Sequence, residues 1–142
     1  MSIEMKKQNF VFLSSLEDFS CQSMLESEII VPDGKEDFAS IILVDPVILI
    51  KEVEPLNNKV SIKGKILYRV IYQAEGEKYK VKSINYENDF YIMPEVKDIN
   101  ENTNVNAKIN TEHLEYKIIH GRKMSVKLII DVKLSAVTKS RQ

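Results

Sequence analysis

Residues 60–72 read Val-Ser-Ile-Lys-Gly-Lys-Ile-Leu-Tyr-Arg-Val-Ile-Tyr, and this stretch decides the fold class. Its even positions are apolar or glycine, while most odd positions are polar or charged. Such a period of two predicts a long, half-buried β-strand. Gly64, in its middle, predicts a bulge or the close approach of another backbone. Residues 124–136 alternate in the same way and predict a second long strand.

Weaker patterns surround these two strands. They predict further strands at about residues 28–31, 47–53, 79–92 and 103–118, with turns at 57–58, 74–77 and 120–122. The apolar residues change phase between Asn110 and His113, so a β-bulge is expected there. Residues 14–25 fit either a helix face or an extended chain. Residues 35–42 predict a short helix that starts near Asp33 and that Asp45-Pro46 ends.

Together these elements predict an all-β chain of seven to eight mostly antiparallel strands, with the short helix near residues 35–42. A single β-sandwich or an open barrel is the architecture that this pattern favours. The composition agrees, because 18 Ile and 13 Val exceed the 10 Leu and 4 Ala, and branched side chains suit a pleated sheet.

Length and charge limit the classes of function. The chain has 142 residues and a net charge of −1, with 20 Lys and Arg against 21 Asp and Glu. One domain of this size buries a core without disulfides or metal. Near-neutral charge argues against nucleic-acid binding by a basic excess. The longest apolar run, residues 41–50, is far shorter than a membrane span, so we expect no membrane insertion and synthesis in a cytoplasm.

Residues able to carry catalysis or hold a cofactor are few. The four glycines, at 34, 64, 76 and 121, fit no phosphate-binding loop. His113 and His120 point to opposite faces of a strand or lie in a turn, so we expect no metal site. We therefore expect no cofactor and no enzymatic activity.

The lone cysteine, Cys21, excludes an intramolecular disulfide. Two interpretations remain for it, a small partly buried hydrophobe and an intermolecular disulfide.

The front of the chain holds a strand-prone apolar segment, Phe10, Val11, Phe12 and Leu13. If this segment is not paired with its own sheet, it is a candidate arm that adds a strand to the edge of a neighbouring molecule. The alternative is a first strand of its own domain, or a tail.

Between residue 28 and about residue 137 a series of short motifs occurs in a fixed order: Ile-Ile-Val-Pro at 29–32, the charged residues 33–37, Ile-Ile-Leu-Val-Asp at 41–45, Val-Ser-Ile-Lys-Gly at 60–64, Val-Ile-Tyr at 70–72, Asp-Phe at 89–90, Leu-Glu-Tyr at 114–116 and Gly-Arg at 121–122. This order of features resembles the SPOCS domain family, which is named for sporulation and spore-coat proteins of endospore-forming bacteria. The resemblance sets residues 1–27 apart as an N-terminal arm, first strand or short helix, and residues 28–139 as the domain.

The resemblance implies a non-enzymatic structural protein of the spore surface, in the coat, exosporium or an appendage. It implies synthesis in the mother-cell cytoplasm, followed by a place on the spore surface. Family members often carry a peptidoglycan-binding LysM domain, for which this chain has no room, so we expect a building block. Its expected partners are copies of itself, in a homo-oligomer or polymer, and other spore-coat proteins.

An alternative function is a module that binds glycan or a small ligand on the forming spore. Its expected stacking surface consists of tyrosines at strand ends, Tyr72, Tyr79, Tyr86 and Tyr91.

Overall fold

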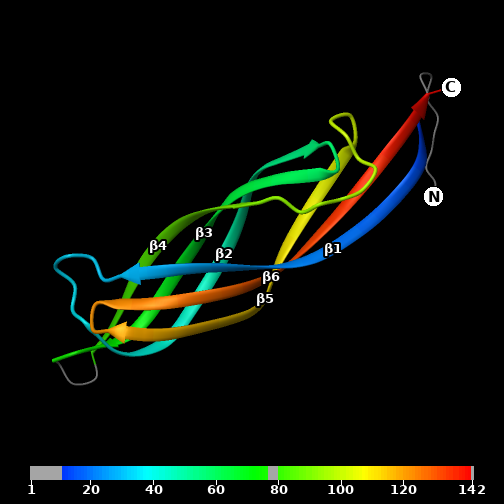
Figure 1. Ribbon diagram of the computed structural model, residues 1–142. Helices are drawn as coiled ribbons and strands as arrows, with labels where there is room; N and C mark the ends of the chain where they lie inside the picture. Colours follow the sequence, from blue (N-terminus) through cyan, green and yellow to red (C-terminus); the bar gives the residue numbers. More distant parts are fainter. Residues whose placement is uncertain (1–10, 77–79, 142) are drawn as a thin grey trace.

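The computed structural model describes residues 11–76 and 80–141, and it consists of strands and the turns between them. Two antiparallel sheets of three strands each, in the orders β1-β6-β5 and β2-β3-β4, lie face to face over one core (Figure 1). The strands are β1 (Val11–Ile30), β2 (Phe38–Leu56), β3 (Lys59–Ala74), β4 (Val81–Ile92), β5 (Asn104–His120) and β6 (Lys123–Arg141).

The two alternating stretches form the middle strand of each sheet, β3 and β6. Their even-numbered residues are buried between the sheets, from Val60 to Ala74 and from Met124 to Ala136. Ile29, Phe38, Val44, Ile84 and Phe90 complete this core from the outer strands. The prediction of two long half-buried strands is confirmed.

Gly64 lies where three strands crowd together. It pairs with Ile50 of β2 and Phe90 of β4, and the register of β2 shifts between Ile50 and Glu52. A Cβ atom at Gly64 would overlap the carbonyl oxygen of Leu49 and would lie 2.8 Å from the Phe90 ring. The expected close approach of another backbone is confirmed, and only glycine fits it.

The expected helix at residues 35–42 is wrong, as is the count of seven to eight strands. Residues 33–35 form a turn and Phe38 begins β2, which continues through Pro46 to Leu56. β2 is an edge strand, where proline is tolerated because no ladder hydrogen bond is lost on the open side. Pairing with β3 buries Phe38 and Val44, which outweighs the local helix signal. The short predicted strands fuse into six long ones.

Other turns and irregularities follow the prediction. The register of β5 shifts between Thr111 and His113, so the expected bulge is confirmed. Turns occupy residues 57–58 and 121–122, and Asn58 has a φ of 60°. β1 runs without a break through residues 27 and 28, so residues 14–25 are extended and belong to the same sheet as β6.

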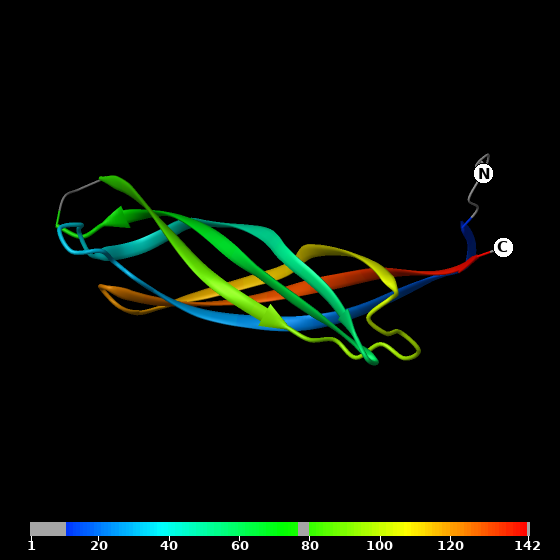
Figure 2. The ribbon, with the colours of Figure 1, turned by 90° about the horizontal axis from the view of Figure 1, so that it is seen from above.

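The molecule is elongated and strongly twisted (Figure 2). β1 and β6 extend past the start of β5, since Asn104 pairs with Val137 while Val11 pairs with Arg141. The two strands thus form a two-stranded ribbon at one end of the molecule, the end where β1 begins and β6 ends (Figures 1 and 2).

Candidate interaction surface

The open edge of β1 is the longest regular strand edge in the described part of the chain. From Ser15 to Ile30 every residue pairs with β6 in one unbroken register. Two other edge strands, β2 and β5, are interrupted by register shifts, at five points in total. β1 also contains no proline, lysine or arginine, which are the residues that commonly protect strand edges. Unpaired backbone groups along this edge are suited to pairing with another strand.

The candidate arm divides at the start of β1. Phe10 lies outside the described residues. The backbone of Val11, Phe12 and Leu13 pairs with residues 139–141 of β6, so this part of the arm forms the first residues of β1. A register shift between Leu13 and Ser15 separates its edge from the regular edge described above.

Cys21 lies on β1 with its side chain exposed. It is paired with Val132, and it lines a pocket of about 330 Å³ with Pro94 and Val96 of the β4–β5 connection. Partial burial, and next the carboxylate of Asp131, raise the pKa of its thiol. The structure therefore leaves Cys21 accessible, and it lowers the thiolate fraction that disulfide exchange requires.

A polar clamp ties the β1–β2 turn to the β5–β6 turn. The Arg122 guanidinium lies 2.6 Å from Asp37 Oδ1 and also donates to the carbonyl oxygens of Val31, Pro32 and Lys35 at 3.1–3.2 Å. A Cβ atom at Gly121 would lie 2.8 Å from Asp37 Oδ2, so the neighbouring glycine gives the carboxylate room. Asp37 and Gly-Arg at 121–122 therefore have a structural role.

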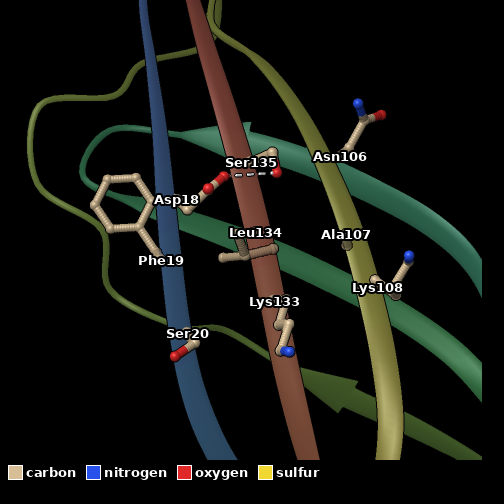
Figure 3. Close-up of a pocket in the computed structure, with 9 residues that line it drawn as sticks. All are labelled: Asp18, Phe19, Ser20, Asn106, Ala107, Lys108, Lys133, Leu134 and Ser135. Atoms are coloured by element: carbon tan, nitrogen blue, oxygen red, sulfur yellow. Dashed lines mark hydrogen bonds between the residues drawn. The ribbon is translucent and has the colours of Figure 1, made fainter.

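A shallow polar groove of about 460 Å³ lies on the β1-β6-β5 sheet (Figure 3). Leu134 is buried in the core, so its neighbours Lys133 and Ser135 face outward. Ser135 Oγ donates to Asp18 Oδ1 at 3.0 Å, and Lys133 is paired in register with Lys108 of β5. The outward side chains carry charges, hydroxyls or, at Asn106, an amide, and Phe19 is the aromatic residue that lines the groove.

The structure contradicts the expected stacking surface at one of its four tyrosines. Tyr72 is fully buried, and its hydroxyl donates to the Glu36 carbonyl oxygen at 2.8 Å. Burial, and next the Glu36 carboxylate, raise the pKa of Tyr72. Tyr91 is 53% exposed and Tyr86 is half-buried, while Tyr79 lies outside the described residues. Tyr72 is therefore a core residue, contrary to the ligand-binding expectation.

The histidines are separate from one another. His113 Nε2 lies 3.1 Å from Glu115 Oε2, and His120 Nδ1 accepts the backbone N–H of Arg122. Within residues 11–76 and 80–141 no three His, Cys, Asp or Glu side chains cluster as metal ligands would. The same residues contain no helix with the length and hydropathy to cross a membrane.

Comparison with known proteins gives one match. A family model described as SipL, SPOCS domain, matches residues 37–119. No curated protein and no solved structure matches the chain significantly. The matched segment begins at the Asp37 clamp and runs through β2, β3 and β4 almost to the end of β5. It covers more than half of the chain, and the protein therefore belongs to the SPOCS domain family of sporulation proteins.

Proposed function

We propose that this protein is a non-enzymatic assembly protein of the bacterial spore surface, in the coat, exosporium or an appendage. It acts by contacts with copies of itself and with other spore proteins, and it reaches the spore surface from the mother-cell cytoplasm. Membership of the SPOCS family supports the sporulation setting. The open, regular edge of β1 is the observation that supports assembly.

Strand addition at β1 has a clear physical basis. In an antiparallel pair, alternate residues direct their N–H and C=O groups away from the partner strand. Over Ser15 to Ile30 that leaves roughly eight residues that offer hydrogen bonds to an incoming strand. β1 carries four acidic and no basic side chains, so an incoming strand with lysine or arginine residues is favoured.

A matched pair of proline variants tests this proposal. Gln22 and Ser23 are adjacent in β1, so the N–H of one points toward β6 and that of the other toward the open edge. Gln22→Pro and Ser23→Pro should therefore differ in stability. One variant loses a ladder hydrogen bond to β6 and has a lower melting temperature, and the other keeps the melting temperature of the native chain.

The assembly readout is size-exclusion chromatography with negative-stain microscopy of the purified full chain. The variant that keeps its stability is expected to lose higher-order assembly. If that variant assembles as the native chain does, strand addition at β1 is wrong. Deletion of residues 1–13 tests the terminal segment separately, and unchanged assembly after this deletion excludes Phe10, Val11, Phe12 and Leu13 as the arm.

A further inference from the structure

The outer face of the β2-β3-β4 sheet carries an apolar patch, in contrast to the polar groove on the other sheet. Val44 of β2 is buried, so the odd-numbered residues in this part of the strand face outward. Two of them, Leu43 and Val47, are 49% and 47% exposed. Leu49 follows on the same face at 42%. Leu67 and Ile71 of β3 are half-buried on this face. These five side chains form what we call the aliphatic patch.

The cross-strand register organises the patch into rows. Leu43 pairs with Ile71, and Val47 pairs with Leu67. Between these two apolar rows lies a charged row in which Asp45 pairs with Arg69. Both charged side chains are exposed, and among the residues that the structure describes neither forms an ion pair. An acid and a base thus stand side by side in the middle of an apolar surface.

This arrangement is self-complementary for one kind of twofold symmetry. A twofold axis parallel to the strands, lying between β2 and β3, places β2 of one copy over β3 of the other. Leu43 then faces Ile71 of the second copy, and Val47 faces Leu67. Asp45 of each copy faces Arg69 of the other copy. An axis perpendicular to the strands would instead oppose Asp45 to Asp45, which is repulsive.

We propose that the aliphatic patch is the interface of a homodimer in which two β2-β3-β4 sheets stack face to face about an axis parallel to their strands. Aligned sheets pack with their strands within about 30° of each other, which is compatible with this symmetry. The dimer uses a different surface from the open edge of β1, so a molecule can engage both at once.

The size of the patch sets the expected affinity. The seven residues from Leu43 to Leu49 extend about 20 Å along the strand, over two strands roughly 5 Å apart. That is a few hundred Å² per copy, below the roughly 800 Å² of a standard interface. We therefore expect a dimer in the micromolar range, with the polar outer residues of β4 at its rim.

Sedimentation velocity over about 1–300 µM of the full chain tests the proposal. Strand addition at β1 would raise the mass further, so this experiment uses the β1 proline variant that keeps its stability, and the charge variants are made in the same background. This parent chain is expected to shift from 16.4 kDa toward twice that mass. Asp45→Lys and Arg69→Glu should each weaken the dimer at least tenfold, because each opposes like charges. The double variant should restore the affinity to within about threefold of the parent chain that keeps Asp45 and Arg69. Val47→Glu should weaken it as well.

Lys127→Glu provides a matched control, because Lys127 is an exposed outward residue of the opposite sheet. It should leave the dimer unchanged. Three results would overturn the proposal: a monomer at every concentration, single charge reversals without effect, or a double variant weaker than both singles. Circular dichroism melts establish that each variant is folded. If one of these three results is obtained while the β1 proline variant still loses assembly, the face-to-face dimer is wrong and the proposed function stands.

Discussion

Replacement of Gly64 by alanine tests the packing of the β2-β3-β4 sheet at its tightest point. The new methyl group would overlap the Leu49 carbonyl oxygen and would lie 2.8 Å from two atoms of the Phe90 ring. A ring at the end of a side chain can turn, but the carbonyl belongs to the backbone of β2, so β2 and β3 must separate. Overpacking of a core costs about 1–3 kcal/mol, and we expect the upper end of that range because backbone must move.

The expected change in melting temperature follows from chain length. Unfolding entropy near 60 °C is about 2.1 cal/mol/K per residue, or roughly 0.3 kcal/mol/K for 142 residues. A loss of about 3 kcal/mol therefore lowers Tm by about 10 °C. Differential scanning calorimetry measures the change in Tm and the loss of free energy of unfolding.

A second variant separates the two clashes at Gly64. Phe90→Leu in the Gly64→Ala background removes the ring contact and leaves the carbonyl contact, so it should recover little of the lost Tm. A loss of under 2 °C in Gly64→Ala would refute the reasoning. Full recovery in the double variant would assign the clash to the ring alone.

Three further predictions concern single side chains. Tyr68 is 1% exposed, and its hydroxyl makes no hydrogen bond of standard geometry among the described residues, although the pKa that burial raises is lowered in part by the Ser27 hydroxyl. Tyr68→Phe should therefore leave stability unchanged or raise it by about 1 kcal/mol in urea unfolding. A loss above about 1 kcal/mol would show that the hydroxyl is bonded to Ser27. Arg122→Ala removes the ion pair with Asp37 and three hydrogen bonds to carbonyl oxygens at a half-exposed site. It should lower the free energy of unfolding by about 1–2 kcal/mol in the same assay. An unchanged free energy of unfolding would show that the clamp contributes no more than a surface ion pair. Because the pKa of Cys21 is raised, its alkylation rate should rise at higher pH than that of a free thiol. Asp131→Asn should move this pH–rate profile toward lower pH, and an unshifted profile would contradict a role for Asp131.

The strands and the bulge could be predicted because their signals are local. The alternation of residues 60–72 and 124–136 has a period that only a half-buried strand produces, and the phase change before His113 marks the bulge directly. The helix at residues 35–42 failed because its start and stop signals are also local. The burial of Phe38 depends on β3, more than 30 residues later.

The interaction surfaces were harder to predict. The apolar run at residues 41–50, interrupted by Asp45-Pro46, is a usable signal, because a strand whose apolar residues do not alternate has apolar side chains on both faces. The position of Asp45 opposite Arg69 needs the register of β2 with β3, which sequence spacing does not supply. The Arg122 clamp joins residues 85 positions apart, and only the fold brings them together.

The measurement that bears most directly on the account is the assembly state of the β1 proline pair, recorded by negative-stain microscopy with the melting temperature of each variant. Our account predicts that the native chain forms higher-order assemblies and that the Gln22→Pro or Ser23→Pro variant with native stability does not. Assemblies that persist in that variant, or a native chain that never assembles, would contradict it.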